Sequence, residues 1–149
     1  MIPEIGHFAL ILALSLAACQ GVMPLIGAHR GDEVLMAIAR PAARGQFVFV
    51  IISFACLAWS FLNDDFSVLY VANNSQLALP DIYKFSAVWG AHEGSLLLWI
   101  LMLSAWTISV ARYSRNLPVP FAARVLGILG LLSCGFMLFT LLTSNPFER

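Results

Sequence analysis

The sequence predicts an all-α integral membrane protein with four transmembrane helices and a short outer loop, containing an interfacial helix, between the second and third. Two features of the composition support this class. The 149 residues are 60% hydrophobic and 11% charged, whereas soluble domains carry about 25% charged residues. The formal net charge is +0, so the chain has no basic field that would attract nucleic acid. We therefore expect a membrane protein with no nucleic-acid partner.

Four apolar stretches have about the right length for membrane-spanning helices. A helix needs about 20 apolar residues to cross roughly 30 Å of hydrocarbon. No Asp, Glu, Lys or Arg lies deep within any of the four stretches. We expect a single membrane domain over residues 1–149, with spans at about 8–27, 46–62, 93–111 and 125–142.

The arginines between the spans predict the orientation. Two connections, between spans one and two and between spans three and four, are rich in arginine: Arg30, Arg40, Arg44, Arg112, Arg115 and Arg124. The connection at 63–92 has one basic residue, Lys84, and three aspartates. The positive-inside rule places arginine-rich loops in the cytoplasm. In a bacterial inner membrane, a multi-pass chain of this kind would have both ends and the 63–92 loop in the periplasm.

Small residues recur at helical spacing in the first and fourth spans. Helices in lipid associate through close packing, which small side chains allow. The two tracks are Ala9, Ala13, Ala17 and Gly21 in the first span, and Ala123, Gly127, Gly130 and Cys134 in the fourth. We expect tight helix–helix contacts along both tracks. Pro24 is expected to end or kink the first span.

The outer loop shows two local patterns. Residues 66–72 are short, β-branched and aromatic, which favours an extended segment. The Asn-Asn-Ser sequence at 73–75 is typical of a turn. Pro80 stands at a suitable first position for a short helix through Phe85, which we expect to lie at the outer membrane surface.

Tryptophans are spaced unusually closely around the start of the third span. If this segment is helical, one face carries Trp89, His92, Leu96, Trp99, Leu103 and Trp106. Trp99 and Trp106 are then about 10 Å apart, too close to mark opposite membrane interfaces roughly 30 Å apart. Two interpretations remain open. The rings pack against neighbouring helices, or they form an aromatic wall for a flat apolar ligand such as haem.

His92 is the histidine that accompanies this aromatic face, and it also has two interpretations. It is a polar interfacial residue hydrogen-bonded to a neighbour, or it is an axial ligand to haem iron or a contact to a haem propionate. Glu93 is favoured near a helix start by the helix dipole and could also orient His92. Trp89, His92, Glu93 and Trp99 are therefore the candidate haem-binding residues, with His92 as the candidate metal ligand; no catalytic residue is predicted.

Several segments resemble the N-terminal part of the CcmF family of cytochrome c-type biogenesis proteins. The similarity is carried by Met1–Gly6, Tyr70-Val71-Ala72, Leu79-Pro80, Tyr83-Lys84, Trp89–Trp99 and Thr143–Phe147. The eleven residues Trp89-Gly90-Ala91-His92-Glu93-Gly94-Ser95-Leu96-Leu97-Leu98-Trp99 are the most specific of these. The similarity extends from one end of the chain to the other, with matching order and spacing.

The resemblance implies a function in cytochrome c maturation. CcmF-type proteins are inner-membrane haem lyase subunits that receive haem from the haem chaperone CcmE. With CcmH-type thiol-handling partners they attach it through thioethers to apocytochrome c. The family also carries a membrane haem b. The implied cofactor is therefore haem, b-type or substrate haem, and the implied partners are these proteins and the remaining C-terminal part of the same protein.

The sequence departs from the family pattern in two respects. The tryptophan-rich W-x-W-D signature is absent, and the family's best-supported haem-ligating histidines belong to a C-terminal part that this chain does not contain. We therefore expect an N-terminal portion that builds one wall of a haem lyase and lacks the reactive centre. Whether it counts as an enzyme by itself stays open.

Two other function classes compete with this interpretation. A haem-free scaffold or assembly subunit that packs against partner membrane helices would need the same small-residue tracks. A transporter or proton-pumping subunit would be expected to place an ionisable residue at mid-membrane, and the four spans contain none. Haem content of the isolated chain separates the scaffold from the lyase.

Overall fold

The computed structural model describes residues 1–149 as seven helices without a strand. The helices are α1 (Ile2–Arg30), α2 (Glu33–Ala37), α3 (Ala39–Leu62), α4 (Leu69–Asn74), α5 (Asp81–Ala87), α6 (His92–Tyr113) and α7 (Val119–Thr143). Four helical stretches are long and apolar enough to cross a membrane: α1, α2 with α3, α6 and α7. The predicted class of an all-α membrane protein with four transmembrane helices is confirmed.

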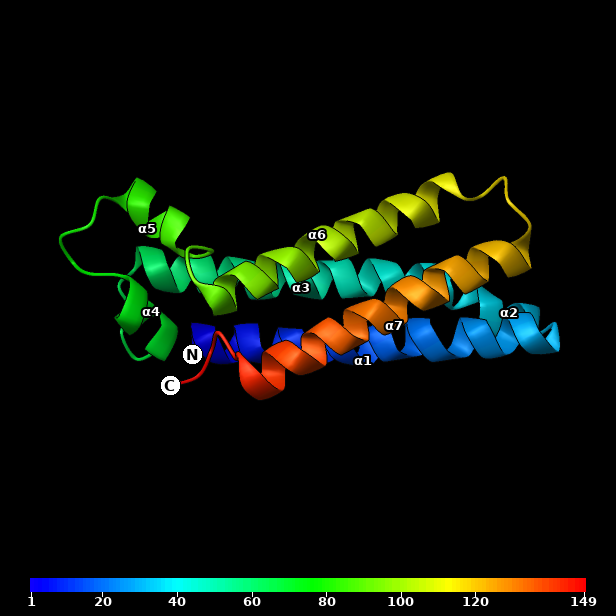
Figure 1. The fold of residues 1–149 in the computed structure, drawn as a ribbon, viewed down its shortest axis with the longest axis horizontal. Coiled ribbons are helices and arrows are strands. Elements are labelled where there is room, and N and C mark those ends of the chain that lie inside the picture. The colour runs from blue at the N-terminus through cyan, green and yellow to red at the C-terminus, as the bar shows by residue number, and fades with distance from the viewer.

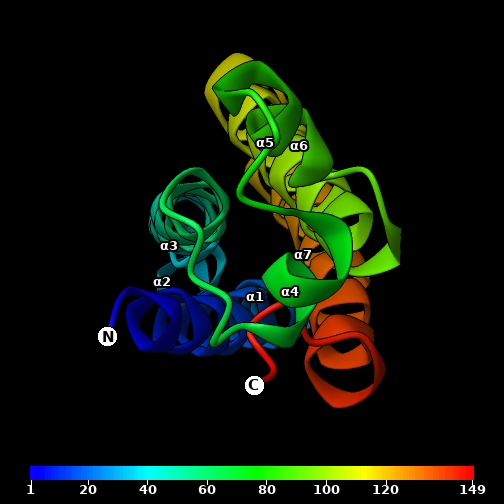
Figure 2. The same ribbon diagram turned by 90° about the vertical axis from the view of Figure 1, so that its left-hand side faces the viewer.

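The four long helices run along one axis, and the short helices gather at the two ends (Figure 1). Both chain ends lie at the same end of the bundle as α4 and α5, whereas α2 and the α6–α7 connection lie at the far end. The view along the axis separates the helices and shows α4 in front of α1 and α7 (Figure 2). Helix α1 packs mainly against α3 and α7, and α6 packs against α3 and α7.

Helices α1 and α7 cross closely at two glycines. A Cβ atom on Gly130 would lie 2.7 Å from the backbone nitrogen of Gly21, so no larger residue fits without a shift. Beside this crossing, Nε2 of the buried Gln20 donates a 2.7 Å hydrogen bond to the carbonyl oxygen of Leu126. The prediction of close packing along the small-residue tracks is confirmed. Helix α1 does not end at Pro24; it continues to Arg30.

The segment at 66–72 is not extended, because Leu69–Asn74 forms helix α4. Tyr70 and Val71 point into the core and are almost fully buried, and Nδ2 of Asn74 donates to the carbonyl oxygen of Tyr70 at 2.9 Å. Strand propensity reports how well side chains fit a half-buried pleated surface. Here the burial of one helical face overrides it. The predicted short helix after Pro80 is confirmed as α5.

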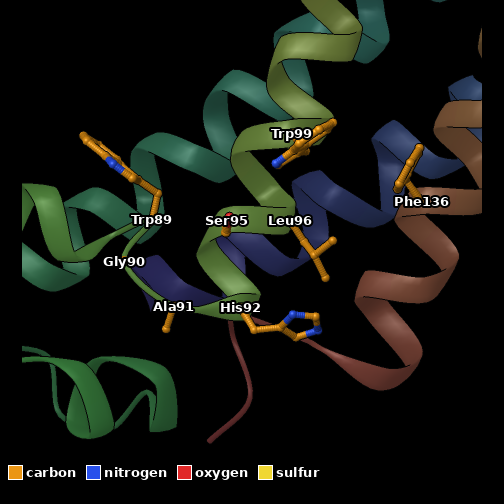
Figure 3. Close-up of a pocket in the computed structure, with 8 residues that line it drawn as sticks. All are labelled: Trp89, Gly90, Ala91, His92, Ser95, Leu96, Trp99 and Phe136. Carbon is orange, nitrogen blue, oxygen red and sulfur yellow. The ribbon is translucent and has the colours of Figure 1, made fainter.

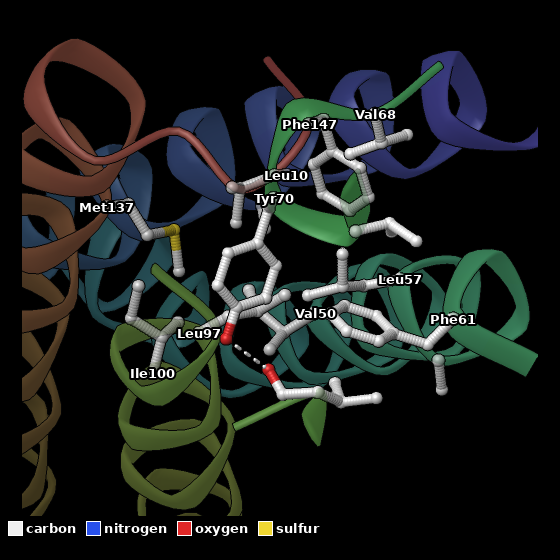
Figure 4. Packing of buried hydrophobic residues seen from close by; sticks show 14 of the residues in the cluster. Leu10, Val50, Leu57, Phe61, Val68, Tyr70, Leu97, Ile100, Met137 and Phe147 are labelled. Atoms are coloured by element: carbon white, nitrogen blue, oxygen red, sulfur yellow. Dashed lines mark hydrogen bonds between the residues drawn. The ribbon is translucent and has the colours of Figure 1, made fainter. Parts of the chain in front are cut away.

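The largest apolar core lies at the end of the bundle that carries α4 and α5 (Figure 4). It joins residues from all four long helices, from α4 and from the segment after α7, including Leu10, Leu57, Phe61, Tyr70, Leu97, Met137 and Phe147. The Glu148 carbonyl oxygen accepts a 2.8 Å hydrogen bond from the Leu69 backbone N–H. The connection between α3 and α6 is therefore packed onto the ends of the long helices.

Candidate functional site

An open cavity lies where the α5–α6 connection enters α6. Its volume is about 440 Å³, and it is lined by Trp89, Gly90, Ala91, His92, Ser95, Leu96, Trp99 and Phe136. Three predicted site residues, Trp89, His92 and Trp99, therefore share one cavity (Figure 3). The lining combines three aromatic rings with one imidazole, which suits a mainly apolar ligand that makes one polar contact.

His92 stands at the first position of α6 and projects from the protein. The residue before it, Ala91, has extended dihedral angles (φ −128°, ψ −178°) and begins the helix without a side-chain cap. The His92 side chain is exposed, and its ring packs edge-on toward Phe139 at a centroid distance of 6.3 Å. The structure gives His92 no hydrogen bond within the chain, so both ring nitrogens are available to a ligand.

The tryptophans occupy different positions from those of a continuous helical stripe. Trp89 precedes α6 and packs edge-to-face against Phe85 of α5, with ring centroids 5.3 Å apart. Trp99 lies in α6 and is 61% exposed. Trp106 is exposed as well but lies outside the cavity. The helix starts too late to include Trp89, which still lines the cavity from the turn before α6.

Glu93 does not line the cavity and forms no hydrogen bond or ion pair with His92. It lies in the first turn of α6, where the helix dipole favours a carboxylate. Phe136, by contrast, reaches the cavity from α7 and was not expected from the sequence. Neither the spacing nor the composition of α7 distinguishes it from the other large apolar residues there.

Tyr70 positions the turn that carries this site. Its hydroxyl donates to the Val88 carbonyl oxygen at 2.9 Å and accepts from the Ala91 backbone N–H at 3.3 Å. Burial raises the pKa of the Tyr70 phenol above its usual value. Gly94 packs against the same group, since a Cβ atom there would lie 1.6 Å from the Val88 carbonyl oxygen and 2.5 Å from the Tyr70 hydroxyl.

A buried ion pair anchors α5. Nζ of Lys84 lies 2.8 Å from the carboxylate of Asp64, and the Lys84 side chain is only 6% exposed. Asp64 adopts a left-handed conformation (φ 54°) just after α3. Such a conformation is uncommon outside glycine but is tolerated by Asp and Asn. The pair ties α5, and through it Trp89, to the end of α3.

The geometry does not provide a multidentate metal centre: no three His, Cys, Asp or Glu side chains converge. A haem iron needs only one or two axial protein ligands, so a single accessible imidazole is the relevant feature. The cavity thus presents one nitrogen donor, aromatic surface and open access from outside the chain.

Comparison with known proteins adds relatives that match the chain from end to end. The chain is 62% identical over 149 residues to the cytochrome c-type biogenesis protein CcmF of Pseudomonas aeruginosa, covering all of this chain and 23% of that protein. It is 50% identical over 149 residues to CcmF of Escherichia coli, again covering 23% of the relative. The chain thus spans about a quarter of the length of these proteins. No family model matches the sequence.

A solved structure agrees with these relatives. The fold matches that of a protein described as the cytochrome c haem lyase CcmF with a TM-score of 0.94 and 28% sequence identity. The match covers 99% of this chain and 25% of the solved chain. The arrangement of the helices is therefore that of a part of a larger membrane protein.

Proposed function

This chain is CcmF-like along its whole length and corresponds to the N-terminal portion of that family. We propose that it forms the N-terminal membrane portion of a haem lyase subunit in cytochrome c maturation. The observation that carries the proposal is the cavity that His92, Trp89 and Trp99 line together. In this role the chain helps to hold haem, while the remaining part of the protein supplies the reactive centre.

The cavity has the polarity and the open access that one face of a haem group would need. Its volume of about 440 Å³ falls within the roughly 300–1,000 Å³ typical of ligand pockets. The exposed ring of Trp99 offers an apolar face to a flat macrocycle and can exclude water from one side of it. When bound, haem would supply the iron and the vinyl groups for thioether attachment.

His92 has one of two roles toward that group. A neutral imidazole nitrogen can donate its lone pair to iron, and an N–H or imidazolium can donate a hydrogen bond to a propionate. The absence of any protein partner for the ring leaves both roles available. No bond joins the Glu93 and His92 side chains. In this proposal Glu93 therefore stabilises the start of α6 through the helix dipole and does not orient His92 directly.

The setting of the chain follows from the same proposal. We place it in the bacterial inner membrane as a multi-pass protein with both ends, α4, α5 and the His92 cavity on the periplasmic side. The arginine-rich connections support this orientation. The partners are the remaining C-terminal part of the same protein, the chaperone CcmE, a CcmH-type thiol-handling protein and apocytochrome c.

One observation favours a second candidate, a haem-free scaffold. Large apolar side chains on the outer faces of α6 and α7 are exposed, among them Trp106, Leu132 and Phe139. In a scaffold these faces would pack against partner helices, and the His92 cavity would close over protein instead of a cofactor.

Expression of separated parts tests the division of labour. The chain and the remaining C-terminal part of its CcmF-type relative would be produced separately or together in cells that lack the protein, and covalent haem in a reporter cytochrome c would be measured. We expect maturation only when both parts are present. Full maturation by this chain alone would overturn the assignment of the reactive centre to the other part.

A further inference from the structure

A second cavity lies at the opposite end of the bundle from the His92 cavity. Its volume is about 350 Å³, and it is lined by Arg44, Ile108, Ala111, Arg112 and Arg115. Arg44 comes from α3, whereas the other residues come from the last turns of α6 and the connection that follows it. Segments about 70 residues apart in the sequence thus bring three arginines to one cavity.

No carboxylate of this chain neutralises these arginines. The three ion pairs of the structure involve Glu4, twice, and Asp64, all at the other end of the molecule. The acidic residues at the arginine-rich end are Asp32 and Glu33. Asp32 is engaged in capping α2, where its Oδ1 accepts from the Val34 and Leu35 backbone N–H groups at 3.0 and 3.4 Å. The cavity therefore carries uncompensated positive charge.

The partial negative charge at the end of α6, which would repel an anion, is offset by Arg40. The last carbonyl groups of a helix carry partial negative charge, and Ala111 of α6 lies in the cavity wall. Its carbonyl oxygen accepts a 3.0 Å hydrogen bond from Nε of Arg40, whose guanidinium also donates to Oγ of Ser114 at 3.3 Å. Arg40 is thus occupied with the helix end, whereas Arg44, Arg112 and Arg115 line the cavity.

We propose that Arg44, Arg112 and Arg115 bind the phosphodiester headgroup of an anionic phospholipid. Guanidinium groups bind phosphate oxygens through paired, charge-assisted hydrogen bonds. The cavity opens between two helices apolar enough to cross a membrane, with Ile108 one turn deeper than Arg112 in its wall. Acyl chains can follow that apolar side into the bilayer, whereas a free phosphate would leave it unused. Basic pockets between membrane helices on the cytoplasmic side are known to favour anionic lipid headgroups.

The site would fix the end of α6 to α3 through the lipid. Without an anion, three exposed like charges line one cavity and repel one another. A bound headgroup removes that repulsion and bridges the two helices. Binding of a lipid by these arginines does not involve haem, so the test of this proposal does not depend on the proposed function.

Native mass spectrometry of the chain in mild detergent tests the proposal. Phosphatidylglycerol, phosphatidylcholine and inorganic phosphate would be added separately to wild type, to the triple variant Arg44→Gln/Arg112→Gln/Arg115→Gln and to the single variant Arg112→Gln. The control is Arg124→Gln, which removes an exposed arginine at the same end but outside the cavity.

We expect wild type to retain one phosphatidylglycerol, with affinity falling roughly fivefold for Arg112→Gln and further for the triple variant, and unchanged in the control. Circular dichroism of each variant keeps a loss of binding distinct from a loss of fold. Equal retention of phosphatidylcholine, or an equal loss in the control, would overturn the site. Competition by millimolar phosphate that removes the lipid completely would assign the arginines to a free anion instead.

Discussion

The hydroxyl oxygen of Tyr70 lies 2.9 Å from the carbonyl oxygen of Val88, to which it donates a hydrogen bond across eighteen residues of sequence (Figure 4). Through this bond α4 holds the turn that ends α5 and begins α6. His92 and Trp89 flank that turn. The position of the candidate haem-binding residues therefore depends on a side chain that does not itself line their cavity.

Removing the Tyr70 hydroxyl should destabilise the end of the bundle that carries α4 and α5. Tyr70→Phe leaves the Val88 carbonyl oxygen and the Ala91 N–H without this buried partner, at a cost of about 1–3 kcal/mol. Thermal unfolding in detergent measures the loss. Tyr83→Phe is the matched control, because Tyr83 is 61% exposed and has no such bond. A Tyr70→Phe variant as stable as this control would contradict the positioning role.

Alkaline pH should weaken the same contact. Because burial raises the pKa of folded Tyr70, the folded state retains its proton where the unfolded phenol, with a pKa of about 10, loses it. The stabilising contribution is present below that pH and is lost as the pH rises toward and through the folded pKa. Unfolding followed from pH 8 to 11 should show a steeper decline for wild type than for Tyr70→Phe. Parallel declines would contradict this assignment.

Gly94 should tolerate no side chain. In Gly94→Ala the new Cβ atom would meet the Val88 carbonyl oxygen at 1.6 Å, so the turn before α6 must move, at a cost of about 1–3 kcal/mol or more. Gly135→Ala in α7 is the control, since nothing lies within 4 Å of the added atom. Comparison of the two melting temperatures checks the prediction. Equal stability of the two variants would show that the turn gives way freely.

The Lys84–Asp64 pair should show strong coupling in a double-mutant cycle. Lys84→Met leaves the Asp64 carboxylate without its partner and should cost about 2–3 kcal/mol, somewhat less than for a fully buried pair. The double variant Lys84→Met/Asp64→Asn should recover part of that loss, and Asn also accepts the left-handed backbone. Arg124→Met, which removes an exposed and unpaired cation, serves as the control. Additive effects in the cycle would contradict the pairing.

The fold could be predicted from the sequence because its main determinants are local. Apolar stretches of suitable length predict the long helices, and glycines such as Gly21 and Gly130 predict close helix contacts, although not that α1 and α7 meet each other. Helix α4 could not be predicted in this way. Its residues favour strand, and its helical form depends on Tyr70 reaching the α5–α6 turn, a long-range contact that no local pattern contains.

The candidate site could be predicted in part. His92 and Trp99 are seven residues apart, which places them on one helical face whatever the neighbouring structure is. Trp89 reaches the cavity by a turn, not by the helical periodicity that suggested it. Phe136 belongs to another helix and becomes a neighbour only through the packing of α6 against α7. The ion pair of Lys84 depends likewise on the tertiary approach of α5 to α3.

The central claim is that the cavity around His92 contacts haem. The most direct test is the dithionite-reduced absorption spectrum of the chain, purified in mild detergent with any cofactor that accompanies it, as wild type, as His92→Ala and as the distant control His29→Ala. We predict a haem band that shifts or disappears in His92→Ala and persists unchanged in His29→Ala. A haem band of the same position and intensity in His92→Ala, or no haem in any sample, would contradict the claim and favour the scaffold.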